Sequence, residues 1–254
     1  MSAKAVAGLA LIAIAGCLTG GGVYAVHQLK QAKYDPRTLC SMEGSKAVSV
    51  ILIDETDPFT EAEKTAARNL AAAEAASAGR GDRITVRLLK QREGADVTEL
   101  GTAADLCNPG SEANPLFENP KRVALRYENA FREPLTQALE NSANTAPAQT
   151  SPIAAAIQES VAAVPESPGQ RLKLTLVTDL MEHTAEASAY TGTLSEAALR
   201  KAVLPPAQAR LRGAEVRILL LSRPRFAKQQ AAAVAVWRRL FLSVTEREPE
   251  FLRP

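Results

Sequence analysis

The stretch Ala47-Val48-Ser49-Val50-Ile51-Leu52-Ile53-Asp54 decides the fold. It is a short run of apolar, mostly β-branched residues that ends in a carboxylate, with Ser49 as its single interior polar residue. Such a run is typical of a strand that is buried on both faces, as the strands of parallel sheets are. We therefore expect residues 47–54 to form the central strand of a mostly parallel sheet.

Apolar runs and amphipathic segments alternate along the rest of the domain. Further strands are predicted at residues 84–89, 96–100, 172–178 and 216–221, the second of them short and at an edge. Helices are predicted at residues 60–78, after Asn119, after Ser151, at 195–203 and at 226–244. Strands that alternate with helices are typical of parallel sheets. The predicted fold class is α/β: a Rossmann-like three-layer sandwich with a mostly parallel central sheet of five or six strands.

Composition excludes several functional classes. The 254-residue chain carries 30 Lys and Arg against 28 Asp and Glu, a formal net charge of +2. It lacks the basic excess of nucleic-acid-binding proteins, so we expect no nucleic-acid partner. Two histidines exclude a multi-histidine metal site, and three cysteines exclude a cysteine-rich zinc module.

The first residues form an uncharged apolar run. Ala5–Val26 covers about 22 residues, long enough as a helix to cross the hydrocarbon core of a bilayer. We expect one N-terminal transmembrane helix; a lipoprotein signal that ends at Cys17 and a cleaved signal peptide are the alternatives. The chain is thus divided into a membrane anchor or signal segment (1–26), a juxtamembrane linker (27–46) and an α/β domain (47–254).

The flanking charges leave the orientation of this segment open. Lys4 and the amino terminus form a short tail of the kind that stays in the cytoplasm, which would export the domain. The larger positive charge after the segment, at Lys30, Lys33 and Arg37, favours a cytoplasmic domain instead. We favour export.

Cys40 and Cys107 are predicted to form a disulfide. Cys17 lies in the membrane or signal segment, which leaves these two cysteines to the folded domain, both in loop-like sequence. Exported proteins use such bridges, whereas cytosolic proteins keep their thiols reduced. The bridge would tie the juxtamembrane linker to the domain; two unpaired thiols in a cytosolic domain are the alternative.

Two of the predicted strands end directly in a carboxylate, at Asp54 and at Asp179. Sites in open parallel sheets form beyond the carboxyl ends of the strands. A third loop offers Thr150 and Ser151 at the start of a helix. Because Mg²⁺ binds carboxylate and hydroxyl oxygens together with water, these loops have the donors for a divalent cation.

At these residues the chain resembles the von Willebrand factor type A domain. The metal-ion-dependent adhesion site of that family uses Asp-x-Ser-x-Ser after the first strand, a Thr from a second loop and an Asp after the fourth strand. The resemblance implies four ligands for Mg²⁺ or another divalent cation: Asp54, Thr56, Ser151 (or else Thr150) and Asp179. Pro58 stands where the second hydroxyl ligand belongs. A degenerate, metal-free crevice is therefore the alternative.

The chain is also similar to a group of uncharacterised bacterial anchored proteins. The likeness lies in the first loop, Thr56-Asp57-Pro58, and in the turn Cys107-Asn108-Pro109-Gly110. It implies an anchored bacterial protein. Together with the export favoured above, we expect a bacterial inner-membrane protein with a single-pass anchor and a periplasmic domain. A lipoprotein anchored at Cys17 and a cytoplasm-facing domain remain the alternatives.

Two functional classes follow. The first is a membrane-tethered protein-interaction module that docks an unidentified protein partner in the crevice at the carboxyl ends of the strands, with or without a divalent metal. The second is a metal-dependent, phosphatase-like hydrolase that uses Asp54. A hydrolase needs a general base of tuned pKa, and none stands out in the sequence. We therefore expect a binding protein rather than an enzyme.

Overall fold

The computed structural model describes residues 34–93, 95–140, 147–203 and 205–254. The predicted anchor, residues 1–26, and the first part of the linker lie outside these described residues. Among the described helices, none is both long enough and apolar enough to span a bilayer.

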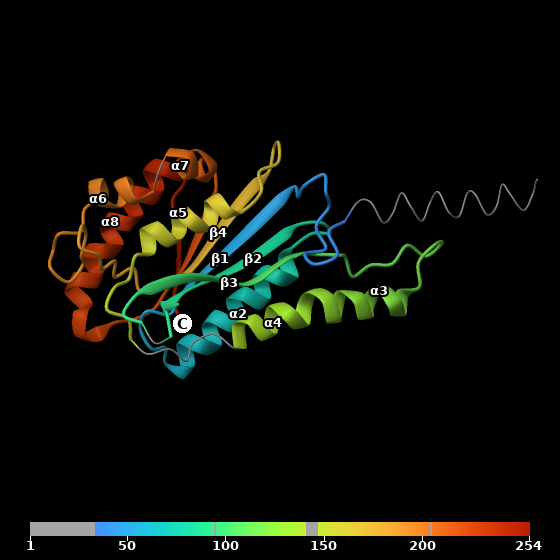
Figure 1. Ribbon diagram of the computed structural model, residues 1–254, viewed down its shortest axis with the longest axis horizontal. Coiled ribbons are helices and arrows are strands. Elements are labelled where there is room, and N and C mark those ends of the chain that lie inside the picture. Colours follow the sequence, from blue (N-terminus) through green and yellow to red (C-terminus); the bar gives the residue numbers. More distant parts are fainter. Residues whose placement is uncertain (1–33, 94, 141–146, 204) are drawn as a thin grey trace, which may run out of the picture.

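One six-stranded sheet forms the centre of the domain, in the order β3-β2-β1-β4-β5-β6 (Figure 1). The strands are β1 (Ala47–Asp54), β2 (Arg83–Gln91), β3 (Thr98–Cys107), β4 (Arg171–Thr178), β5 (Glu215–Leu220) and β6 (Glu250–Leu252). All neighbouring pairs are parallel except β2 and β3. The prediction of a mostly parallel sheet with residues 47–54 in its middle, beside strand 172–178, is confirmed.

Helices cover both faces of this sheet (Figure 1). They are α2 (Glu61–Ser77), α3 (Pro120–Tyr127), the π-helical turn η1 (Glu128–Arg132), α4 (Glu133–Glu140), α5 (Ile153–Ala163), α6 (Glu196–Ala202), α7 (Pro205–Leu211), the 3₁₀ turn η2 (Pro224–Phe226) and α8 (Ala227–Thr245). Val50 and Leu52 of β1 pack into one core with α5 to α8. Ile51 and Ile53 pack into a second core with α2, η1 and α4. Successive side chains of β1 thus point to opposite faces of the sheet, and each face is covered by its own layer of helices.

Local sequence signals set the helix boundaries as predicted. Thr60 and Glu63 form a capping box at the start of α2. Asn119 caps α3 by accepting hydrogen bonds from two backbone amides. Residues 120–140 remain helical through Pro134, the second residue of α4. The turn η1 lies immediately before α4, where a wider turn accommodates the missing amide of the proline.

Three elements differ from the prediction. β3 is longer than residues 96–100, because its polar side chains pair across to β2: Arg83 Nε donates to Asp105 at 2.7 Å. These cross-strand polar pairs hide the apolar alternation that marks a strand. The short elements α7 and β6 were not predicted. α7 begins at Pro205, which suits a first helical turn, and β6 has only three residues.

The predicted disulfide joins Cys40 to Cys107, with Cα atoms 4.8 Å apart. Because β3 runs antiparallel, its last residue lies at the amino ends of the parallel strands, where β1 begins. The backbone amide of Cys107 also donates to the carbonyl of Thr38 at 2.7 Å. The segment before β1 is therefore attached to the edge strand both covalently and by hydrogen bonding.

Candidate functional site

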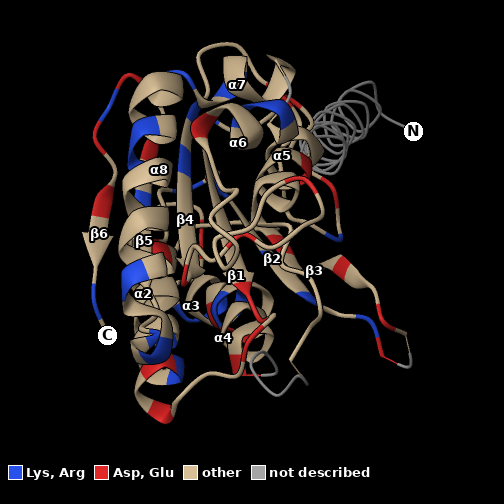
Figure 2. Cartoon of the chain, turned by 90° about the vertical axis from the view of Figure 1, so that its left-hand side faces the viewer, with Lys and Arg blue, Asp and Glu red and all other residues tan. Residues whose placement is uncertain are grey.

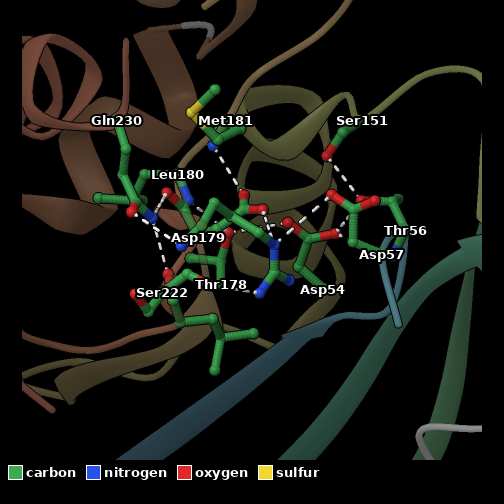
Figure 3. Close-up of polar contacts among 12 residues, drawn as sticks. Asp54, Thr56, Asp57, Ser151, Thr178, Asp179, Leu180, Met181, Ser222 and Gln230 are labelled. Atoms are coloured by element: carbon green, nitrogen blue, oxygen red, sulfur yellow. Dashed lines mark hydrogen bonds and ion pairs between the residues drawn. The ribbon is translucent and has the colours of Figure 1, made fainter. Parts of the chain in front are cut away.

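The carboxyl ends of β1 and β4 carry a closed cluster of polar side chains. Figure 2 views the molecule from this side and shows acidic residues, in red, where β1 ends. Asp54, the last residue of β1, is only 3% exposed. Its Oδ1 accepts from the hydroxyl of Thr56 at 2.6 Å and from the amide of Thr56 at 3.2 Å. Its Oδ2 accepts from the hydroxyl of Thr178 at 2.8 Å (Figure 3). Both carboxylate oxygens of Asp54 are thus engaged within the protein.

Ser151 joins the same cluster from the loop before α5. The hydroxyl oxygens of Ser151 and Thr56 are hydrogen-bonded at 3.0 Å (Figure 3). Ser151 is held in place by two backbone hydrogen bonds with His183, each 2.9 Å long. Thr150, the alternative to Ser151, is exposed and instead forms a hydroxyl–hydroxyl hydrogen bond with Thr98. Of the two, the structure therefore brings Ser151 to the cluster.

Asp179 follows β4 in a tight turn beside this cluster. Its Oδ1 accepts from the amide of Met181 at 2.8 Å. The residue between them, Leu180, has a left-handed backbone with φ of 62°, which is strained for a side chain other than glycine. Two side chains of α8 fix the turn: Trp237 donates to the carbonyl of Leu180 at 3.1 Å, and Gln230 donates to the carbonyl of Asp179 at 3.0 Å. The packing of α8 thus determines where the Asp179 carboxylate lies.

Arg223, which the sequence analysis missed, supplies the positive charge of the cluster. Its Nε lies 2.8 Å from Oδ2 of Asp179, an electrostatic contact rather than an aligned hydrogen bond. Its guanidinium also lies 3.2 Å from Glu63 and 3.8 Å from Asp57. Arg223 comes just after β5. Because the carboxyl ends of parallel strands meet at one edge of the sheet, Arg223 lies at the same edge as Asp54 and Asp179.

Glu182 is a second residue that the sequence analysis missed. It is 2% exposed, and its carboxylate accepts from the backbone amide of Ala154 at 2.9 Å, in the first turn of α5. Pro152, at the N-cap of α5, gives that helix no side-chain cap. Glu182 therefore caps α5 from another loop, where the positive end of the helix dipole favours a carboxylate.

Burial raises the pKa of three of the buried carboxyls at this edge, Asp54, Asp179 and Glu182. Burial and the neighbouring charge of Asp54 raise the pKa of Asp179 to about 7, against the opposing effect of Arg223. Burial raises the pKa of Asp54 as well, although the hydroxyls of Thr56 and Thr178 oppose this. Burial raises the pKa of Glu182 to about 8. Because Asp54 and Asp179 repel each other when both are charged, ionisation of one opposes ionisation of the other.

The stability of the protein should therefore fall as the pH rises from about 5 to about 8. Unfolded carboxyls release their protons near pH 4, whereas Asp179 and Glu182 hold theirs to about 7 and about 8. Between these values the folded state binds more protons than the unfolded state, so deprotonation favours unfolding. Urea unfolding at pH 5 and pH 8.5 measures the difference.

The variant Glu182→Gln keeps the hydrogen-bond acceptor for Ala154 and removes the titration, so it should reduce this pH dependence. Glu186→Gln, an exposed carboxyl in the same loop, is the matched control and should leave the pH dependence unchanged. A protein that is equally stable or more stable at pH 8.5 would contradict the assignment.

The donor set fits a divalent cation poorly. A hard cation needs several free oxygen ligands, but both oxygens of Asp54 accept hydrogen bonds and the guanidinium of Arg223 is in contact with Asp179. Pro58 adds no hydroxyl. Within the residues that the structure describes, no group of three or more His, Cys, Asp or Glu side chains is arranged to hold a metal ion. Metal binding by Asp54, Thr56, Ser151 and Asp179 stays a prediction, and the geometry favours the metal-free alternative.

Comparisons with known proteins add little beyond the fold. No protein-family model and no curated protein matches the sequence. The chain is similar to the human COPII-coat protein Sec24c at 13% identity and a TM-score of 0.38, over 84% of this chain and 30% of that chain. It is similar to an aerotolerance-related membrane protein from Bacteroides fragilis at 13% identity and a TM-score of 0.33, over 76% of this chain and 98% of that chain. The TFIIH p34 N-terminal domain matches at 12% identity and a TM-score of 0.33, over 84% and 93%. Likenesses this weak carry no argument about function.

Proposed function

We propose that this protein is a membrane-tethered protein-interaction module that binds a protein partner at the carboxyl edge of its sheet and does so without a metal. The observation that carries the proposal is a half-buried aromatic surface beside the polar cluster. Tyr190 makes edge-to-face contacts with His183 and with Phe226, with ring centroids 5.3 and 4.9 Å apart. Arg225, which is exposed, lies over the ring of Phe226 at 5.5 Å.

These residue types favour protein binding. Aromatic and arginine side chains dominate the energetics of protein interfaces, because they bury a large area at a small entropic cost. The polar cluster beneath them holds the loops in place: His183 pairs with Ser151, and Arg223 lies three residues before Phe226. We call Tyr190, Phe226, His183 and Arg225 the aromatic surface. Its support by fixed loops is what a preformed binding surface needs.

The geometry disfavours the hydrolase alternative. A nucleophilic carboxylate must present a free oxygen to its substrate, whereas Asp54 is 3% exposed and both its oxygens accept hydrogen bonds. Glu182, whose pKa burial raises to about 8, is also buried and caps a helix. In this arrangement these groups stabilise the loops of the site.

Tethering and export form the second part of the proposal. The apolar run at residues 5–26 has the length and lack of charge of a membrane anchor. The disulfide between Cys40 and Cys107 supports an oxidising compartment, which for an anchored bacterial protein is the periplasm.

Site-specific photo-crosslinking in the native membrane tests the binding function. A benzophenone side chain in place of Tyr190 should form a discrete adduct with one protein, and Phe226→Ala in the same chain should lower its yield about tenfold, because interface aromatics carry most of the binding energy. The same probe in place of Leu242, an exposed residue of α8 outside the aromatic surface, is the matched control and should form none.

Equal adducts at positions 190 and 242, or an adduct that Phe226→Ala leaves unchanged, would contradict a specific surface. A phosphatase or esterase activity that requires Mg²⁺ and is abolished by Asp54→Asn would establish the hydrolase instead.

A further inference from the structure

Large exposed hydrophobic side chains gather at the end of the domain opposite the candidate site. Leu116 and Phe117 are 80% and 82% exposed, and Leu125 of α3 is 61% exposed. Tyr34 and Met42, in the segment before β1, are also exposed. Among the described residues, only two other large hydrophobics are exposed to this degree, Val97 and Leu242. We call Leu116, Phe117 and Leu125 the apolar tip.

The apolar tip projects at the α3 end of one long helical segment. Residues 120–140 form a continuous helical segment, about 31 Å long at 1.5 Å per residue. Its α4 end packs against α2 and β3, whereas α3 has no buried residue. Figure 1 shows α3 extending beyond the amino ends of the strands, on the side where the described chain begins.

The path of the chain brings the predicted anchor to the same end. Cys40 is bonded to Cys107 at the amino ends of the parallel strands, and Tyr34 forms a β-bridge with Ser41 beside it. The uncharged run ends at Val26, and the residues between it and Tyr34 reach at most about 25 Å when fully extended. A bilayer spanned by residues 5–26 therefore lies within reach of the apolar tip.

The charge of this end also suits an anionic membrane surface. The amino ends of the strands line a cavity of about 560 Å³ with six cationic side chains and three carboxylates. Arg171 and Arg247 are the exposed cations among them that form no ion pair with a described residue. Next to the apolar tip, α3 adds Lys121, Arg122 and Arg126. Apolar side chains flanked by basic ones are typical of segments that lie in the membrane interface.

We propose that the apolar tip inserts into the interface of the bilayer that holds the anchor, so that the domain stands with the amino ends of its strands against the membrane and its candidate site facing away. This inference rests on the tether of the proposed function. The disulfide fixes the base of the linker, and the tip supplies a second attachment point, which restrains rotation of the domain about its anchor.

Fluorescence quenching by brominated lipids tests this orientation in the full chain. The chain carrying Phe117→Trp is reconstituted in vesicles of phosphatidylcholine and phosphatidylglycerol, with and without bromine on the acyl chains. Bromine should lower the emission of Trp at position 117 about twofold, because an interfacial side chain reaches the upper acyl chains. The matched control is Val97→Trp, an exposed position in the turn between β2 and β3 at the opposite end of the domain, where emission should be unchanged. The native Trp237 is fully buried and serves as the common background.

The possible outcomes separate the two proposals. Quenching at position 117 and not at 97 supports the inference. A chain that remains with the vesicles in alkaline carbonate but is quenched at neither position, or equally at both, overturns the orientation and leaves the tether intact. A chain that does not remain with the vesicles overturns both the tether and the orientation.

Discussion

Replacing Arg223 by methionine should lower the free energy of unfolding by about 3–5 kcal/mol, the cost of removing one partner from a buried ion pair. The guanidinium contacts Asp179 and Glu63, and both of these carboxylates are at most 5% exposed. Methionine fills most of the volume of the arginine stem but leaves the carboxylates without a cation. Urea unfolding at pH 8.5, where the buried carboxyls are most highly charged, should show the largest loss.

Two further variants make this result specific. Arg225→Met removes an exposed arginine two residues away and should change stability by less than about 0.5 kcal/mol, as surface substitutions do. Asp179→Asn combined with Arg223→Met should cost less than the sum of the two single changes, because the two residues interact directly. A loss below about 1 kcal/mol for Arg223→Met would mean that the guanidinium does not offset the negative charge of the buried carboxylates.

The same variant tests the choice between a metal and an internal cation. Millimolar Mg²⁺ should not raise the melting temperature of the natural protein, because Arg223 already neutralises Asp179. In Arg223→Met, Mg²⁺ should raise it, since a cation that binds only the folded state stabilises that state. A clear Mg²⁺ effect on the natural protein would restore the metal site predicted from the resemblance.

Removing the disulfide should cost about 4 kcal/mol on the loop-entropy model, because it closes a loop of about 66 residues. The variant Cys40→Ser with Cys107→Ser removes the bridge without leaving a thiol in the domain. Both cysteines are nearly inaccessible, at 8% and 0% exposed, so a reducing agent should act on the natural protein only slowly or after partial unfolding. Thermal unfolding with and without reductant measures the effect.

The double serine variant provides the control, since reductant should leave its melting temperature unchanged. The fully reduced natural protein should unfold at about the same temperature as this variant. A natural protein that reacts with a thiol reagent at Cys40 and Cys107 before any reductant is added would contradict the bridge, and with it the support for export.

The sheet could be predicted because its central strand β1 is apolar along most of its length. Four consecutive residues of this strand are apolar and buried, as expected for a strand that is covered on both faces: Val50, Ile51, Leu52 and Ile53. β3 was predicted too short for the opposite physical reason. It lies at an edge of the sheet, where polar pairs such as Arg83 and Asp105 replace apolar contacts. Its sequence therefore lacks the alternation of apolar and polar residues by which a strand is recognised.

The site could be predicted in part, for a similar reason. Asp54 and Asp179 end strands, so topology alone brings them to one edge. Arg223 and Glu182 lie in loops, and their contacts depend on the direction in which their side chains point. The pattern of strands in the sequence does not predict that direction. Their partners also lie far away in the sequence: Arg223 and Glu63 are 160 residues apart. Ser151 was found because a helix start provides a local signal.

The bridge between Cys40 and Cys107 also determines how the domain responds to mechanical tension. Residues 41–106, which contain β1, α2, β2 and nearly all of β3, lie inside the covalent loop that it closes. A pulling force applied through the N-terminal segment passes from residue 40 directly to residue 107 and bypasses this loop. The segment that such a force can extend begins after Cys107, so β1, α2 and β2 are shielded from direct loading through the anchor.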